Sequence, residues 1–88
     1  MTQEQLHDLL QKLENARSQI DPVDREGHQR LDDLVESLEQ QKLYPDDFDR
    51  YSVLADQARE IVLEIEADHP ALARILEGIS GVLRSFSA

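Results

Sequence analysis

The apolar residues of this chain recur every three or four positions, which is the spacing of an amphipathic α-helix. In the first segment they are Leu6, Leu9, Leu10, Leu13, Ala16 and Ile20. Thr2 and Gln5 precede this stripe at the spacing of a capping box, in which each side chain bonds the backbone amide of the other residue. The pattern predicts a first helix over residues 3–19.

A break at Asp21–Pro22 precedes the second segment. Aspartate is a good N-cap, proline fits the first helical position, and Asp24 suits the positive end of the helix dipole. The apolar positions that follow are Val23, Leu31, Leu34, Val35 and Leu38. They predict a second helix over residues 22–42.

The third segment follows a break at Pro45, because proline disfavours helical geometry at the residue before it. We expect Asp46 or Asp47 to cap a helix over residues 47–67. Its apolar stripe consists of Phe48, Tyr51, Leu54, Ala55, Ala58, Ile61, Val62 and Ile65. Val53 and Leu63 lie off this stripe, either as scattered exposed residues or as a second contact surface.

The last segment opens with His69–Pro70, where Asp68 or His69 is expected to cap a helix over residues 70–86. The apolar positions of this helix are Leu72, Ile75, Leu76, Ile79, Val82, Leu83 and Phe86. They occupy about 120° of the helical wheel at roughly 100° per residue, which is the cleanest amphipathic pattern in the chain.

Four helices joined by short turns indicate an all-α single domain, with an up-down bundle of four helices as the expected arrangement. Two helical hairpins completed by dimerisation are the alternative. In that case the third and fourth helices can form one long helix kinked at Pro70, whose apolar face a second copy would cover.

The last helix contains two glycines, Gly78 and Gly81, each of which weakens a helix by about 1 kcal/mol relative to alanine. Ala71, Gly78 and Ser85 are seven residues apart, and they form a row of small side chains beside the apolar stripe. Such a row lets another helix approach closely. We therefore expect Ala71, Gly78 and Ser85, with Val53 and Leu63, as interface residues.

The C-terminal segment EADHPALARILEGISGVLRSFSA also resembles the end of a family of short bacterial proteins described as a domain of unknown function, DUF4404. The matching positions are His69, Pro70, Leu72, Leu76, Ile79 and Leu83. The resemblance implies a bacterial, cytoplasmic helical protein. It implies no active site.

The chain has a net charge of −10, from 19 acidic and 9 basic residues. This charge repels phosphates and anionic lipids, so we expect neither nucleic acid nor a membrane surface as a partner. The apolar runs are far too short to span a bilayer, and we expect no secretory signal at the N-terminus. The absence of cysteine is compatible with a cytoplasmic location.

Asp24, His28, Asp32 and Glu36 recur every four residues, and this row is the best candidate for binding a divalent cation. We interpret it as a solvated acidic face, because a strong site needs further ligands from other helices. The segment from Asp47 to Ala58 lacks the glycine and the glutamate of a calcium loop. No nucleophile elbow or phosphate loop is present, so we expect no catalysis and no cofactor.

Two functional hypotheses remain. The first is a helical module that associates with itself, as a homodimer, or with another protein. The second is an acidic protein that inhibits or mimics a nucleic acid by covering the basic surface of a nucleic-acid-binding protein. The two differ in salt dependence, since an apolar interface resists salt and a charge-driven one weakens.

Overall fold

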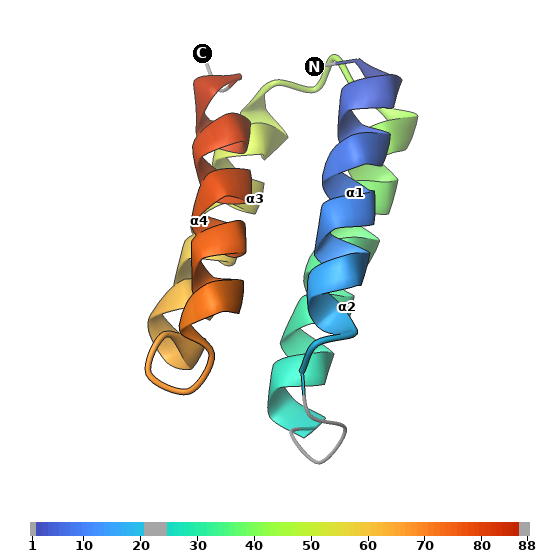
Figure 1. The fold of residues 1–88 in the computed structure, drawn as a ribbon. Helices are drawn as coiled ribbons and strands as arrows, with labels where there is room; N and C mark the ends of the chain where they lie inside the picture. Colours follow the sequence, from blue (N-terminus) through green and yellow to red (C-terminus); the bar gives the residue numbers. More distant parts are fainter. Residues whose placement is uncertain (1, 21–24, 87–88) are drawn as a thin grey trace.

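The computed structural model of the protein describes residues 2–20 and 25–86. It contains four helices: α1 (Gln3–Arg17), α2 (Arg25–Leu43), α3 (Asp49–Ile65) and α4 (Pro70–Ser85). The helices run alternately down and up, with α1 and α4 in front of α2 and α3 in the view of Figure 1. The described residues contain no strand. The predicted all-α arrangement of four helices is confirmed.

Helices α3 and α4 are separate, because residues 66–68 form a turn and His69 leaves helical geometry with φ −135° and ψ 66°. The alternative of one long helix kinked at Pro70 is therefore wrong. His69 occupies the N-cap position of α4, but its side chain makes no capping hydrogen bond. Pro70 opens the helix, and the amide of Ala73 donates to the carbonyl oxygen of His69.

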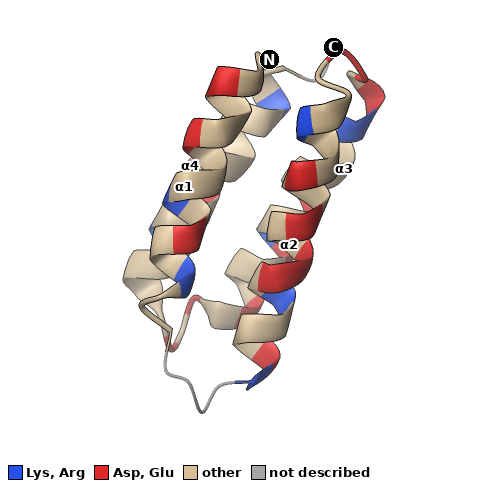
Figure 2. Cartoon of the chain, turned by 90° about the vertical axis from the view of Figure 1, so that its right-hand side faces the viewer, with Lys and Arg blue, Asp and Glu red and all other residues tan. Residues whose placement is uncertain are grey.

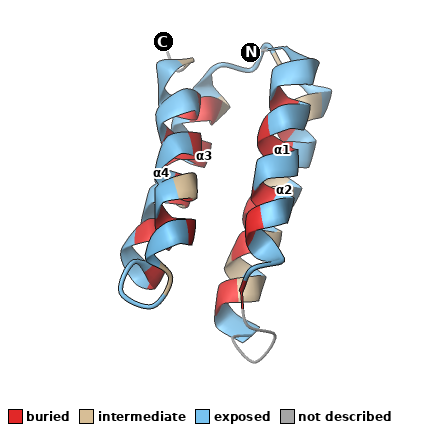
Figure 3. Ribbon diagram, viewed as in Figure 1, coloured by how far each residue is buried: buried red, intermediate tan, exposed pale blue. Residues whose placement is uncertain are grey.

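The four apolar stripes meet along the centre of the bundle, where Figure 3 shows the buried segments. All six stripe residues that were predicted for the first helix are buried. In α2 the buried leucines are Leu31, Leu34 and Leu38, and Val35 is partly buried. The predicted core position Val23 and the cap residues Asp21, Pro22 and Asp24 lie outside the described residues.

Two predicted core positions are open to solvent: Phe48 is 45% exposed and Val82 is 41% exposed. Phe48 precedes the first turn of α3 and lies at the end of the bundle. Val82 lies on the side of α4 that faces α1 across a groove. Ile75 and Phe86 are partly buried, and the other four stripe residues of α4 are buried as predicted.

The start of α1 has the predicted capping box. The amide of Gln5 donates to Thr2 Oγ1 at 3.2 Å, and the amide of Thr2 donates to Gln5 Oε1 at 2.9 Å. The helix ends at Arg17, two residues earlier than predicted, because Ser18 and Gln19 form a turn.

The start of α3 differs from the prediction, because Asp46 and Asp47 do not cap it. The helix begins at Asp49, and Phe48 holds the N-cap position without a side-chain hydrogen bond. Two buried side chains fix the turn instead. Gln41 Nε2 donates to the carbonyl oxygens of Tyr44 and Asp47, each at 3.0 Å. The Tyr51 hydroxyl donates to the carbonyl oxygen of Pro45 at 2.6 Å.

Candidate interaction surface

Small residues bring α4 close to α3. Ala55 and Ala58 of α3 are buried, as are Ala73 and Ser80 of α4. Ser80 Oγ donates a buried hydrogen bond to the carbonyl oxygen of Ala55 at 2.9 Å. The contact between α3 and α4 is the most extensive one between the described helices, whereas the contact between α4 and α1 is the least extensive. The fourth helix therefore leans toward α3 and leaves space on its other side.

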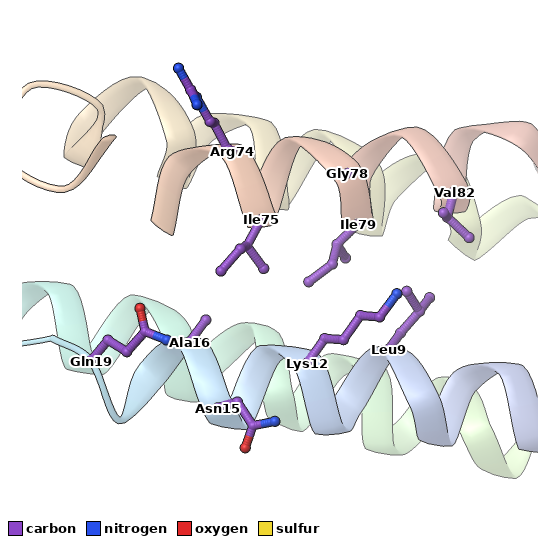
Figure 4. A pocket seen from close by; sticks show the side chains of 10 residues that line it. All are labelled: Leu9, Lys12, Asn15, Ala16, Gln19, Arg74, Ile75, Gly78, Ile79 and Val82. Carbon is purple, nitrogen blue, oxygen red and sulfur yellow. The ribbon is translucent and has the colours of Figure 1, made fainter. Parts of the chain in front are cut away.

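That space is a groove of about 540 Å³ between α1 and α4. Helix α1 contributes Leu9, Lys12, Asn15 and Ala16, and Gln19 follows from the turn after it. Helix α4 contributes Arg74, Ile75, Gly78, Ile79 and Val82. Figure 4 shows Ile75 and Ile79 extending from α4 toward α1. Ala16 and Gly78 add little volume, so the facing side chains do not fill the gap.

The groove combines apolar walls with two cations, Lys12 and Arg74, and none of the acidic residues that the structure describes lines it. Neither cation forms an ion pair with another described residue. By contrast, other arginines join neighbouring helices: Arg17 pairs with Asp32, and Arg30 with Glu64. Unpaired cations beside an apolar gap are suited to contact a partner that carries carboxylates.

The charge of the protein is unevenly distributed over its helices. Helix α1 has three acidic and two basic residues and α4 has one acidic and two basic, so together they are neutral. Helices α2 and α3 each have two more acidic than basic residues. Figure 2 shows acidic residues along the length of α2. The side formed by α1 and α4 is therefore the one that a second acidic molecule can approach with the least repulsion.

The predicted row of small residues, Ala71, Gly78 and Ser85, is exposed. Gly78 is its one member that lines the groove. A Cβ atom built on Gly78 or Gly81 would meet nothing within 4 Å. Packing within the described chain therefore does not require glycine at either position. Contact of this row with another molecule stays a prediction.

Val53 and Leu63, the other two predicted interface residues, are 64% and 66% exposed on α3. Neither of them lines the groove. The structure does not bring them together with the small row of α4 into one surface. Their role in an interface stays a prediction.

The acidic row of the second helix is only partly described, because Asp24 lies outside the described residues. Asp32 pairs with Arg17 of α1 at 2.6 Å. His28 Nε2 is buried and has no hydrogen-bond partner among the described residues. In the described part of the chain, no three histidine, aspartate or glutamate side chains are placed to hold a metal ion. None of the described helices is long and apolar enough to cross a membrane.

Sequence reasoning missed Lys12 and Arg74 as members of the candidate surface. The only signal was the low charge of the segments that contain them. Residues 1–20 carry three acidic and two basic residues, and residues 69–88 carry one acidic and two basic. The two cations can be placed at one groove only when it is known that α1 and α4 lie side by side.

The chain matches a known family. The profile of the family described as "Domain of unknown function (DUF4404)" matches residues 3–86, which is nearly the whole chain. No curated protein and no solved structure matches.

Proposed function

We propose that this chain, a member of the DUF4404 family, is a non-catalytic helical module that associates with a second copy through the α1–α4 face. We define this face as the groove residues together with Ala71 and Ser85. The observation that supports the proposal is the open apolar groove on the neutral side of an acidic protein.

The energetic reason is burial of apolar surface, which stabilises association by about 25 cal/mol for each Å² removed from water. Ile75 and Val82 are core-type residues that the single chain leaves partly open to solvent. A helix of a second copy, laid in the groove, would cover them. The acidic helices α2 and α3 would then lie away from the contact, where their charges remain hydrated.

Gly78 supports the same arrangement, because a glycine in an exposed helix costs about 1 kcal/mol relative to alanine and the chain itself leaves its position open. The absence of a side chain allows the backbone of another helix to approach. Gly81 is equally open, and what marks Gly78 as the contact position is that it lines the groove.

Two glycines in one helix provide a matched test. Gly78 lines the groove and Gly81 does not, yet both are exposed and both have free space around a Cβ atom. The variants Gly78→Gln and Gly81→Gln should therefore raise helix propensity by the same amount, up to about 1 kcal/mol. Sedimentation velocity over a range of concentrations reports association, and thermal unfolding reports stability.

We expect the parent and Gly81→Gln to dimerise, and Gly78→Gln to remain monomeric because its side chain occupies the space of the partner helix. A parent chain that stays monomeric at every concentration would refute self-association. Equal dimerisation of both variants would show that the α1–α4 face is not the contact.

The acidic side of the bundle supports a second candidate function. The excess of acidic residues on α2 and α3 is suited to cover a basic protein surface, as an inhibitor or mimic of a nucleic acid does. Binding of this kind should weaken sharply as salt rises, because it depends on charge. Self-association through the apolar groove should persist at high salt, so ionic strength distinguishes the two functions.

A further inference from the structure

Asp8 and Lys12 are an acid and a base one helical turn apart on α1, so their side chains lie on the same face of the helix. Both residues are exposed, and neither forms an ion pair or a hydrogen bond with another described residue. Lys12 lines the groove, and Figure 4 shows its side chain extended into the space between α1 and α4.

A two-fold axis that passes between the acid and the base of one helix brings a second copy of that helix against the same face. The acid and base of the one copy are then complementary in charge to those of the other. When the two helices run antiparallel, the acid of each copy lies opposite the base of the other. In a parallel arrangement like charges would be opposite each other, which is unfavourable. The pair therefore specifies both the direction and the register of a contact between two copies.

We infer that two copies associate with their α1 helices antiparallel, so that Asp8 of each copy pairs with Lys12 of the other. The α1–α4 face of each copy then lies against the α1–α4 face of the other. This inference rests on the proposed self-association and adds the register. Of the residues that the structure describes, the charged ones that line the groove are Lys12 and Arg74, so few other charges there compete with the two pairs.

Charge reversal tests the inference, with dimer dissociation constants measured by sedimentation equilibrium at low salt. In the proposed dimer, Asp8→Lys and Lys12→Glu each convert both Asp8–Lys12 pairs into pairs of like charges. We expect each to weaken the dimer by about tenfold or more. The swapped variant Asp8→Lys/Lys12→Asp restores both pairs, and we expect its dissociation constant within about threefold of the parent.

Net charge alone cannot produce this result. Asp8→Lys and Lys12→Glu move the net charge of −10 by two units in opposite directions. General repulsion therefore predicts that Asp8→Lys strengthens the dimer. Arg59→Glu is a control with the same charge change as Lys12→Glu. It lies on an exposed position of α3, away from the groove, and should leave the dimer nearly unchanged.

The outcomes separate the two proposals. Single variants that dimerise like the parent, or a swapped variant as weak as the single variants, would overturn the register while self-association stands. A parent without any dimer would overturn both. Circular dichroism of each variant checks that the helices are retained, which is expected because both side chains are exposed.

Discussion

The hydroxyl of Ser80 on α4 donates a buried hydrogen bond, 2.9 Å long, to the carbonyl oxygen of Ala55 on α3. A carbonyl oxygen has two lone pairs, so it can accept this bond in addition to one within its own helix. The bond requires the two helices to approach closely, and the small size of both residues permits it. It therefore helps to explain why α4 lies against α3 and leaves a groove toward α1.

Substitutions at Ser80 test this close approach. Ser80→Ala should lower the free energy of unfolding by about 0.5–1.5 kcal/mol, because it removes one hydrogen bond without adding volume. Ser80→Leu should cost more, since overpacking adds about 1–3 kcal/mol. Urea denaturation of the parent and both variants gives the comparison. A leucine variant as stable as the alanine variant would argue against close packing.

The helical stripes could be predicted from the sequence because burial repeats with the period of the helix. Leu72, Leu76 and Leu83 follow this period and are buried. Gln41 and Ser80 are also buried, but their polarity gave no reason to expect it. Burial of these polar side chains is tolerated because Gln41 bonds carbonyl oxygens of a turn and Ser80 bonds one of a neighbouring helix. The fold alone determines which carbonyl oxygens lie within reach.

The candidate surface could be predicted only in part. Gly78 was identified by its spacing from other small residues along one helix, which is local information. The involvement of Lys12 depends on α1 lying beside α4, and no pattern along the chain determines that. The sequence predicts Asp46 or Asp47 as the cap of α3, because aspartate is a good N-cap. Gln41 and Tyr51 fix this turn instead, through tertiary contacts.

Leu76 and Val82 lie in the same helix and differ in burial, at 0% and 41% exposed. Leu76→Ala should cost about 2–5 kcal/mol, because it opens a cavity in the core. Val82→Ala should change the free energy of unfolding by less than about 1 kcal/mol, since part of its side chain is already hydrated. Chemical denaturation below the concentration of dimerisation measures both. Equal losses would contradict the orientation of α4.

Tyr51 is fully buried, and its hydroxyl bonds the carbonyl oxygen of Pro45. Tyr51→Phe should therefore cost about 1–2 kcal/mol at neutral pH, because the bond is lost and its acceptor stays partly shielded from water. Denaturant unfolding of the parent and the variant at neutral pH measures this difference.

The difference should depend on pH. Burial raises the pKa of Tyr51 above 10.0, the neighbouring Gln41 side chain partly offsets this, and Asp46 and Asp47 raise it further. A pKa raised by folding means that the protonated hydroxyl stabilises the fold below the unfolded value and that this contribution is lost as pH rises through the folded value. The advantage of the parent over Tyr51→Phe should therefore shrink as pH rises above 10.0 and through the folded value. A constant difference would contradict the burial of the hydroxyl.

Gln41 is buried, and its amide group donates to two carbonyl oxygens of the turn between α2 and α3. Gln41→Met should cost about 1–3 kcal/mol, because it removes both bonds while keeping the volume of the side chain. Gln41→Glu should cost more at neutral pH, since a buried carboxylate would face those carbonyl oxygens and the nearby Asp47. The folded state should then raise the pKa of this glutamate above that of the unfolded chain. The extra penalty should therefore disappear as pH falls toward about 4.

Unfolding measured at both pH values compares the two variants, and hydrogen exchange of the Asp47 and Phe48 amides reports the turn. If Gln41→Glu and Gln41→Met lowered the free energy of unfolding equally at neutral pH, the side chain at position 41 would have to be hydrated. The turn would then have to be held by Tyr51 alone.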